Sequence, residues 1–325
     1  MIDSSFRARA TIDLRALKKN FLQVSAHCPE SQIVPVIKAN AYGHGVEKVA
    51  LALNAMHRKF AALAVASMEE AIQLRTLGLS TPILLLSGFR DKVEMDLCLN
   101  NKIEPVIHSM YQVEEIDKYL QTEIPTGVGR VWVKFNSGMN RLGFDKEQAL
   151  RVYEDLHRHP ETEVVFMSHL ASADDPESQS AVELTQRQIA EFDSLKQQIA
   201  SSTQGPVQAS LAASAGILSL PQTHHQFVRP GFMLYGGSPF TNRTAQEIGL
   251  LPVMTLRAKI IAINNVDAGG TIGYGATHRC RQSTRVGIVS IGYADGYPRS
   301  AKNGTPVLVN TKQGPRRAGL LGRVS

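Results

Sequence analysis

The chain has 325 residues, which is long for one ordinary domain and indicates one large barrel or two domains with separate cores, of which we expect the second. Its apolar content of 43% is typical of a globular protein, and no apolar run approaches the ~20 residues needed to cross a membrane. The formal net charge of +6 comes from lysines and arginines scattered along the chain without a long basic block, which argues against nucleic acid as a partner and suits a small anionic ligand.

The first residues, MIDSSFRARATIDL, contain no hydrophobic signal core, so the expected compartment is the cytoplasm. Cys28, Cys98 and Cys280 are odd in number, widely spaced and without a C-x-x-C pattern. This spacing argues against both a disulfide framework and a zinc site. We therefore expect inert thiols and no metal.

A helix is predicted near the start, because Asp13 suits the N-cap position and the apolar residues from Leu14 to Val24 recur on one face. From there to about residue 240, short β-rich runs alternate with amphipathic helices, as in a parallel sheet with crossover helices. The predicted strands are IVPVIKA from Ile33, AALAVAS from Ala61, PILLLSG from Pro82, IEPVIHS from Ile103, RVWVKFNSG from Arg130, VVFMSHLA from Val164, VQASLAASA from Val207 and FVRPGFMLYGG from Phe227. The clearest helices span Glu69–Leu77, Ser109–Leu120, Lys146–Arg158 and Ser178–Ser201.

Eight such units predict an α/β fold, a (β/α)8 TIM barrel over residues 1–240, with the site at the carboxyl ends of the strands. After about Gly249 the helical period disappears. The segments VMTLRAKIIAINNV, GGTIGYGATHRC, RVGIVSIGYADGYPR and TPVLVN read as strands with Gly, Asn and Asp turns. A mostly β C-terminal domain is therefore predicted over residues 241–325, with residues 1–11 as an alternative part of it.

The run VIKANAYGHG places Lys38 at the carboxyl end of the first predicted barrel strand, directly before a glycine-rich turn. A lysine there is partly desolvated, which favours the neutral amine that attacks an aldehyde cofactor. The structural alternative is a lysine whose stem packs on the strand end while its amine reaches water.

Polar residues gather at the other predicted strand ends, which carry His108, Asn136 to Arg141, His169, Ser214, and Arg229 to Gly231. The phosphate site of such barrels commonly follows strands seven and eight, where backbone N–H groups are free at a helix or turn start. Ser214 and the turn Pro230-Gly231-Phe232 fall at these two places. The sequence therefore favours a phosphate site there.

Six motifs in chain order resemble the alanine racemases: IKANAYGHG, VKFNSGMNRLGF, MSHLASAD, VRPGFMLYGGSP, IGYGATH and IGYADGYPR. This resemblance spans nearly the whole chain and implies a fold-type III pyridoxal 5'-phosphate (PLP) enzyme with a barrel followed by a β-domain. It further implies a homodimer with active sites shared between head-to-tail subunits. The implied reaction interconverts L-alanine and D-alanine, either for peptidoglycan or in alanine catabolism.

By this resemblance Lys38 would bind the cofactor covalently and share the catalysis with Tyr274 of the β-domain. Racemisation needs an acid and a base on opposite faces of the α-carbon, because a single base tends to return the proton to the face it left. A tyrosine with a pKa of about 10 is a poor base at neutral pH unless positive neighbours stabilise its phenolate. His169 and Arg141 would supply that help.

The resemblance also implies how the cofactor would be held. Tyr42 and Ser214 would bind its phosphate together with the backbone N–H groups of Gly231 and Phe232. Arg229 would face the pyridine nitrogen. Because a guanidinium does not give up its proton, it would keep that nitrogen unprotonated and weaken the electron sink, so side reactions should be fewer.

Supporting roles are implied for four further residues. Arg141 would contact the cofactor's phenolic oxygen and the substrate carboxylate, and Lys134 would be a carbamylated lysine that steadies Arg141. His169 would link Tyr274 to Arg229, and Tyr293 would help to line the entrance to the site. From the residues alone, structural alternatives stay open: an ordinary ion-pair cluster of Arg141 and Lys134 with Asp145, a hydrogen-bonded structural histidine at His169 and a packed aromatic at Tyr274.

Two features depart from the family's pattern. Ala213 precedes Ser214 where the family usually has Asn-Ser, which removes one polar side chain. The sequence ends at LGRVS, where the family continues with Met-Asp and a stretch that contributes to substrate and phosphate binding, so we expect a β-domain that is truncated or closed in another way. The alternatives to an active racemase are a catalytically impaired relative or a PLP-binding protein without turnover.

Overall fold

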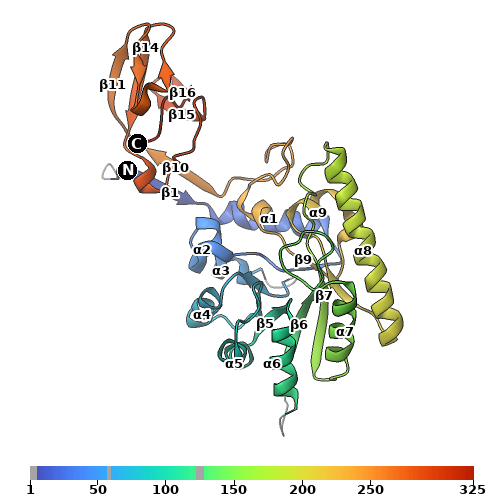
Figure 1. The fold of residues 1–325 in the computed structure, drawn as a ribbon. Coiled ribbons are helices and arrows are strands. Elements are labelled where there is room, and N and C mark those ends of the chain that lie inside the picture. The colour runs from blue at the N-terminus through green and yellow to red at the C-terminus, as the bar shows by residue number, and fades with distance from the viewer. Residues whose placement is uncertain (1–5, 57–59, 122–127) are drawn as a thin grey trace. The chain divides into compact units, whose positions relative to one another are not determined.

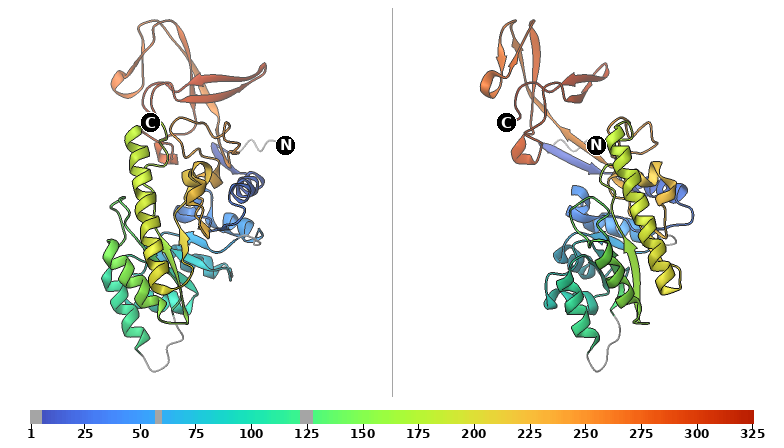
Figure 2. Two further views of the ribbon diagram at one scale, coloured as in Figure 1. Left: turned by 90° about the vertical axis from the view of Figure 1, so that its right-hand side faces the viewer. Right: turned by 45° about the vertical axis from the view of Figure 1, so that its right-hand side comes forward.

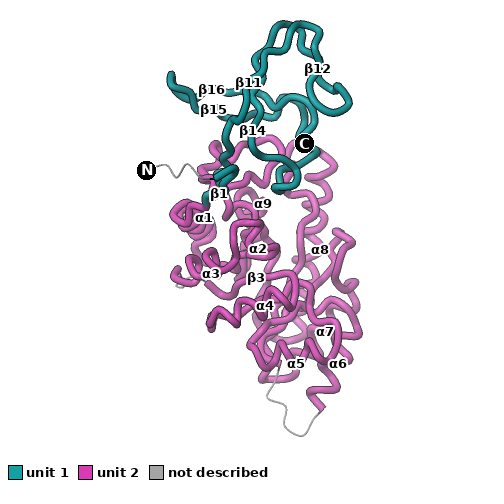
Figure 3. The backbone as a smooth tube through the Cα atoms, turned by 90° about the vertical axis from the view of Figure 1, so that its left-hand side faces the viewer, with its two compact units in different colours: residues 1–11, 254–325 teal, residues 12–253 magenta. Residues whose placement is uncertain are grey.

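The computed structural model describes residues 6–56, 60–121 and 128–325. It contains two compact units, drawn in different colours in Figure 3. The barrel unit comprises Ile12–Val253, and the β unit comprises Met254–Ser325 with the N-terminal residues up to Thr11. Leu250 and Val253 are buried in the barrel core, so the chain leaves the barrel unit only after them.

The barrel unit is built on parallel strands (Figure 1). In chain order these are β2 (Gln32–Ile33), β3 (Leu63–Val65), β4 (Ile83–Leu85), β5 (Ile103–Ile107), β6 (Gly129–Lys134), β7 (Thr162–Met167), β8 (Gln208–Ser210) and β9 (Phe227–Val228). β3 to β8 form one sheet in chain order, and β9 pairs in parallel with β2. Bridges between Val36 and Ala64 and between Ala213 and Arg229 complete the ring. The predicted (β/α)8 barrel is therefore confirmed.

Helices cover the outside of this barrel, and the long helix α8 lies beside α7 (Figure 2). α1 (Leu14–His27) begins at the predicted cap, where the Asp13 side chain accepts hydrogen bonds from the backbone N–H groups of Arg15 and Ala16. The others in the described residues are α2 (Lys38–Gly43), α3 (Val46–Asn54), α4 (Met68–Thr76), α5 (Lys92–Asn100), α6 (Met110–Leu120), α7 (Lys146–His157), α8 (Gln179–Thr203) and α9 (Ser214–Ser219), with short 3-10 turns η2 (Pro221–Thr223) and η3 (Phe232–Tyr235). α4, α6, α7 and α8 match the predicted helices to within two residues at each end.

Apolar side chains fill two layers of the barrel unit. Because successive strand residues point to opposite faces, Trp132 lies in the interior layer while Val131 and Val133 lie in the layer beneath the helices, and all three are fully buried. The interior layer also contains Val34, Val36, Ala64, Leu84, Val106, Val165 and Phe227. A barrel filled in this way has its site at the carboxyl ends of the strands.

The β unit consists of short antiparallel pairs. β11 (Ile260–Val266) pairs with β14 (Thr284–Val289), β12 (Thr271–Ile272) with β13 (His278–Arg279), and β15 (Pro306–Thr311) with β16 (Gly314–Gly319). β10 (Met254–Ala258) is hydrogen-bonded to β1 (Ala8–Ile12). The predicted mostly β C-terminal domain is therefore confirmed. Across the described parts of both units, no helix is long and apolar enough to cross a membrane.

Candidate active site

The turn that begins at Lys38 has an unusual backbone. The chain enters it from Ile37, which is fully buried, and Lys38 itself is half-buried. The next four residues, Ala39 to Tyr42, have φ angles of 52°, 52°, 54° and 53°, so consecutive residues with side chains are left-handed. This conformation costs roughly 1–2 kcal/mol per residue, and such strain concentrates at functional sites. The strand that was predicted to run through Ala39 is therefore replaced at Lys38 by this turn.

Tyr42, Ser214 and the turn at Gly231 come together at one place. The Ser214 Oγ accepts hydrogen bonds from the backbone N–H groups of Gly231 at 3.2 Å and Met233 at 3.3 Å. A Cβ added to Gly231 would lie 2.7 Å from Tyr42 Oη, so glycine leaves room beside that hydroxyl. Phe232 is the first residue of η3 and is 50% exposed. Because two N–H groups donate to its oxygen, the Ser214 hydroxyl keeps its own proton for another acceptor, and a hydroxyl donor of this kind suits a phosphate.

Aromatic packing holds Tyr42 in position. Its ring centroid lies 4.9 Å from that of Tyr235, and the His44 ring lies 4.6 Å from the same tyrosine. The Tyr235 hydroxyl donates to the Val36 carbonyl oxygen at 3.1 Å, which ties the rings to the segment that leads to Lys38. Burial raises the pKa of Tyr42, so its hydroxyl remains a hydrogen-bond donor at neutral pH. Tyr235 was not singled out from the sequence, because a buried aromatic residue in a strand region is usually core.

Arg229 is buried after β9 and its guanidinium donates to groups at several strand ends. The acceptors are the Ser210 hydroxyl, the Ser168 carbonyl oxygen at 2.6 Å and the Leu211 carbonyl oxygen at 3.3 Å. The guanidinium also lies 3.4 Å from His169 Nδ1, so these two predicted site residues are together. Burial, reinforced by nearby positive charges, lowers the pKa of His169 to about 3. The neutral ring then accepts at Nδ1 and carries its proton on Nε2.

Lys134, Arg141 and His169 line one small hollow over the ends of β6 and β7. Lys134 is 8% exposed. Burial first, and then the positive charges of Arg229, Arg141 and Lys38, lower the pKa of Lys134 to about 8. Its amine is therefore partly uncharged near neutral pH, which is unusual for a lysine.

Gln188 of α8 supports this hollow, and the sequence analysis missed it. The side chain is fully buried. Its Oε1 accepts from the Ala171 N–H at 2.8 Å, and its Nε2 donates to Ser137 Oγ and to the His169 carbonyl oxygen, each at 3.2 Å. One amide thus ties together the loops that follow β6 and β7, which carry Arg141 and His169.

Tyr274 and Tyr293 belong to the β unit. Tyr274 lies in the loop between β12 and β13, flanked by Gly273 and Gly275, whose φ angles are 69° and 72°. The side chain of Tyr274 is 73% exposed and that of Tyr293 is 55% exposed. Neither ring is used to fill the core of its own unit, so both are open to contact another surface.

The residues at the carboxyl ends of the barrel strands fit PLP. The hydroxyls of Tyr42 and Ser214 are of a kind that binds phosphate, the Lys38 amine is of a kind that reacts with an aldehyde, and the Arg229 guanidinium is a cation that does not give up its proton. Within the described residues, no group of three or more His, Cys, Asp or Glu side chains is placed to hold a metal ion.

Comparison with known proteins identifies the family. Residues 12–239 match the family model for the alanine racemase N-terminal domain, and residues 253–325 match that for the alanine racemase C-terminal domain. An alanine racemase from Vibrio parahaemolyticus is 43% identical over 320 residues, which cover 98% of this chain and 83% of that protein.

Solved structures agree with this match. The biosynthetic alanine racemase from Pseudomonas aeruginosa is 39% identical and superposes with a TM-score of 0.85, covering 98% of this chain and 84% of that one. The alanine racemase from Bartonella henselae with covalently bound pyridoxal phosphate is 28% identical, with a TM-score of 0.80, a coverage of 98% of this chain and 84% of that one. Both domains are matched in the same order and over most of each relative. The chain therefore belongs to the alanine racemase family.

Proposed function

We propose that this chain is a PLP-dependent alanine racemase that interconverts L-alanine and D-alanine. One observation carries the proposal. Tyr42, Ser214 and the Gly231 turn lie together and form a group that we call the phosphate cradle, and Tyr42 belongs to the turn that begins at Lys38. The chain that holds this group belongs to the alanine racemase family. PLP, when bound, supplies an electron sink for the α-carbon of the substrate. An impaired relative or a binding protein without turnover gains no support from the relatives, which are named as racemases.

Lys38 and Tyr274 divide the proton transfer in this proposal. The Lys38 amine takes or gives the α-proton on one face, and the Tyr274 phenol does so on the opposite face, as inversion requires. His169 supports Tyr274. With its Nδ1 facing Arg229, the neutral ring keeps an Nε2–H that can donate to a phenolate oxygen.

Arg229, Arg141 and Lys134 supply the remaining charges. Arg229 donates to the pyridine nitrogen and keeps it unprotonated. Arg141 contacts the substrate carboxylate and the cofactor's phenolic oxygen. Lys134 is carbamylated in this proposal, since a pKa of about 8 leaves a fraction of uncharged amine to react with carbon dioxide. The carbamate would place a negative charge among the cations that surround Lys134.

The proposed assembly is a homodimer in which Tyr274 and Tyr293 serve the barrel of the other subunit. Their exposure supports this arrangement, because a phenol that fills no core in its own unit is free to contact a partner. Tyr293 would line the entrance to the site. The D-alanine formed would serve peptidoglycan or alanine catabolism, and the expected compartment is the cytoplasm, which cell fractionation tests.

Cofactor binding followed by turnover tests the function. The purified chain titrated with PLP should gain a visible absorption band that borohydride removes, and peptide mapping should find the pyridoxyl group on Lys38. Incubation with L-alanine should then give D-alanine, measured by chiral chromatography. Lys38→Ala should lose both results, whereas Lys48→Ala, at an exposed position of α3, should keep both. Absence of PLP uptake, or a label on another lysine, would contradict the proposal.

A further inference from the structure

Glu70 connects the Lys38 turn to the neighbouring strand of the barrel. It lies in the first turn of α4, after the N-cap residue Ser67. Its Oε1 accepts a hydrogen bond from the Ala39 N–H at 2.5 Å, and its Oε2 accepts one from the Ala66 N–H at 2.8 Å. Ala39 directly follows Lys38, and Ala66 directly follows β3. One carboxylate therefore joins the Lys38 turn to the carboxyl end of β3.

The Lys38 turn depends on such contacts, because residues with side chains rarely adopt its left-handed backbone. The later part of the turn is held by its own segment. Asn40 Oδ1 accepts from the Val46 N–H at 2.8 Å, and the Ala41 N–H donates to the Ile37 carbonyl oxygen at 2.9 Å. The first left-handed amide, that of Ala39, is instead held by a side chain from a different helix.

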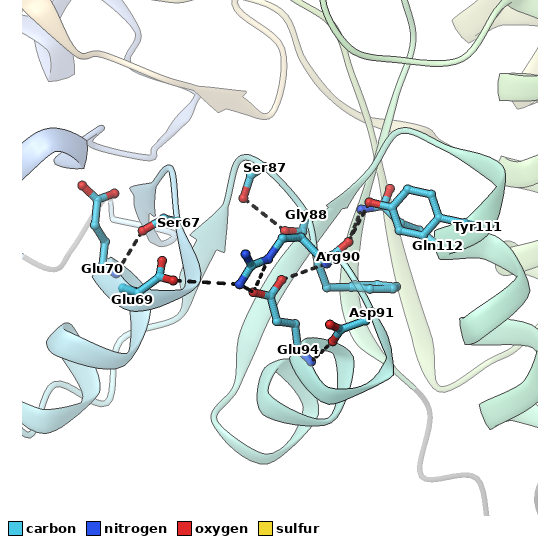
Figure 4. Close-up of polar contacts among 11 residues, drawn as sticks. Ser67, Glu69, Glu70, Ser87, Gly88, Arg90, Asp91, Glu94, Tyr111 and Gln112 are labelled. Carbon is cyan, nitrogen blue, oxygen red and sulfur yellow. Dashed lines mark hydrogen bonds and ion pairs between the residues drawn. The ribbon is translucent and has the colours of Figure 1, made fainter.

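The adjacent Glu69 has other surroundings and offers a matched control. Figure 4 shows the Glu69 side chain directed towards Arg90, while the Glu70 carboxylate points away from that group. The Glu69–Arg90 distance is 3.9 Å, and both side chains are largely exposed. Arg90 is also paired with Glu94, so it keeps a partner when Glu69 loses its charge. Glu69→Gln therefore removes a neighbouring carboxylate without touching the turn.

We propose that Glu70 is a positioning residue for the cofactor site, because its carboxylate fixes the backbone of the Lys38 turn. The inference rests on the proposed function only in taking PLP as the ligand. Lys38 and Tyr42 stand at the two ends of the turn, and the fixed backbone lets the amine and the hydroxyl reach the aldehyde and the phosphate of one molecule. The competing explanation is a role confined to α4, since a carboxylate in a first helical turn favours any helix.

Two substitutions separate these roles. Glu70→Gln keeps the size of the side chain but replaces one oxygen acceptor by an amide NH2, which then faces a backbone N–H. Ser67 caps α4, because its Oγ accepts a hydrogen bond from the Glu70 N–H at 3.3 Å. Ser67→Ala removes this cap and leaves the Glu70 carboxylate intact. A role confined to α4 predicts similar behaviour of both variants, whereas a role at the turn predicts an effect of Glu70→Gln on the turn that Ser67→Ala does not share.

Amide hydrogen exchange of the full chain without PLP is the first measurement. In the peptide that covers residues 38–46, Glu70→Gln should exchange at least about tenfold faster than the wild type. Glu69→Gln and Ser67→Ala should match the wild type there, and Ser67→Ala should instead accelerate exchange in α4. Wild-type exchange of residues 38–46 in Glu70→Gln would overturn the proposal, whether or not the chain binds PLP.

PLP titration with borohydride trapping at Lys38 is the second measurement. Glu70→Gln should raise the Kd for PLP about tenfold or more and slow the trapping, while Glu69→Gln should change neither. Glu70→Asp keeps both oxygens on a shorter stem and should fall between Glu70→Gln and the wild type. An unchanged Kd in Glu70→Gln would refute the positioning role. A wild-type chain that takes up no PLP would instead refute the proposed function, and the exchange measurement would still decide the role of Glu70.

Discussion

Tyr274 is the residue proposed to transfer the α-proton on the face opposite Lys38, and its side chain is exposed. Tyr274→Phe removes one hydroxyl from a side chain that is 73% exposed, so folding and PLP binding should be unchanged. Exchange of the α-proton should fall ~10²- to 10⁴-fold, mainly from the L enantiomer, because Lys38 remains for the other face. Deuterium exchange into L- and D-alanine measures this, with Tyr297→Phe in the same unit as the control. Small and equal losses for both enantiomers would indicate a structural tyrosine.

His169 predicts a pH dependence of stability. Its pKa is about 3 in the folded protein, below its ordinary value of 6.5, so the unfolded chain takes up a proton at mildly acid pH that the barrel does not. Between about pH 7.5 and 5, this residue alone should lower the free energy of unfolding by up to about 2 kcal/mol. Urea unfolding at both pH values should therefore show a smaller drop for His169→Asn than for the wild type. His157→Asn removes an exposed histidine of α7 and is the control. If the free energy of unfolding of His169→Asn fell between the two pH values as much as that of the wild type, the assignment would be contradicted.

The turn at Gly231 shows how an element limits the side chains around it. In Gly231→Ala the new Cβ would lie 2.7 Å from Tyr42 Oη, so the phenol must move from the phosphate cradle. Loss of one hydrogen bond to a charged group costs about 1.5–3 kcal/mol, which corresponds to a roughly tenfold to hundredfold higher Kd for PLP. Titration with PLP measures the change. Gly205→Ala is the control, because the nearest atom to its added Cβ is 3.7 Å away, and it should bind PLP like the wild type. The same Kd for PLP in both variants would refute the role of the Gly231 turn in phosphate binding.

Helix α8 acts on the site through Gln188. Gln188→Ala leaves the Ala171 N–H and the Ser137 hydroxyl without this partner, which should lower the free energy of unfolding by about 1–3 kcal/mol. The loops that carry Arg141 and His169 should loosen as well, so kcat/KM should fall. Gln197→Ala, at an exposed position of the same helix, is the control. Wild-type stability together with wild-type kcat/KM in Gln188→Ala would show that the bridge is dispensable.

The same helix can contain a feature that was predicted from the sequence and a residue that was missed, and α8 is an example. Hydrophobic periodicity predicted the helix α8, in which Phe192, Leu195 and Ile199 are fully buried. The same signal could not find Gln188 or Glu70, because a polar residue on an amphipathic helix looks solvated until its partner from another element is known. The left-handed turn from Ala39 to Tyr42 could not be predicted either, because none of its four residues is a glycine.

Across the whole molecule, the proposed catalytic pair is divided between the two units, with Lys38 in the barrel unit and Tyr274 in the β unit. Periodicity predicted two domains but gave no reason to connect them. The ordered motifs connect them, because they assign both residues to one reaction. In the proposed dimer each site takes its lysine from one subunit and its tyrosine from the other.

Complementation between Lys38→Ala and Tyr274→Phe tests that account most directly. Each variant alone should be almost inactive, because every site in its dimers lacks one base. In a hybrid dimer one site has both substitutions and the other has neither, so purified hybrid dimers should recover about half of the wild-type activity. Co-expression of the two variants with different tags, followed by purification of hybrid dimers and a racemisation assay, gives the measurement. Inactive hybrid dimers, beside an active wild-type dimer, would contradict a site that joins Lys38 of one subunit to Tyr274 of the other.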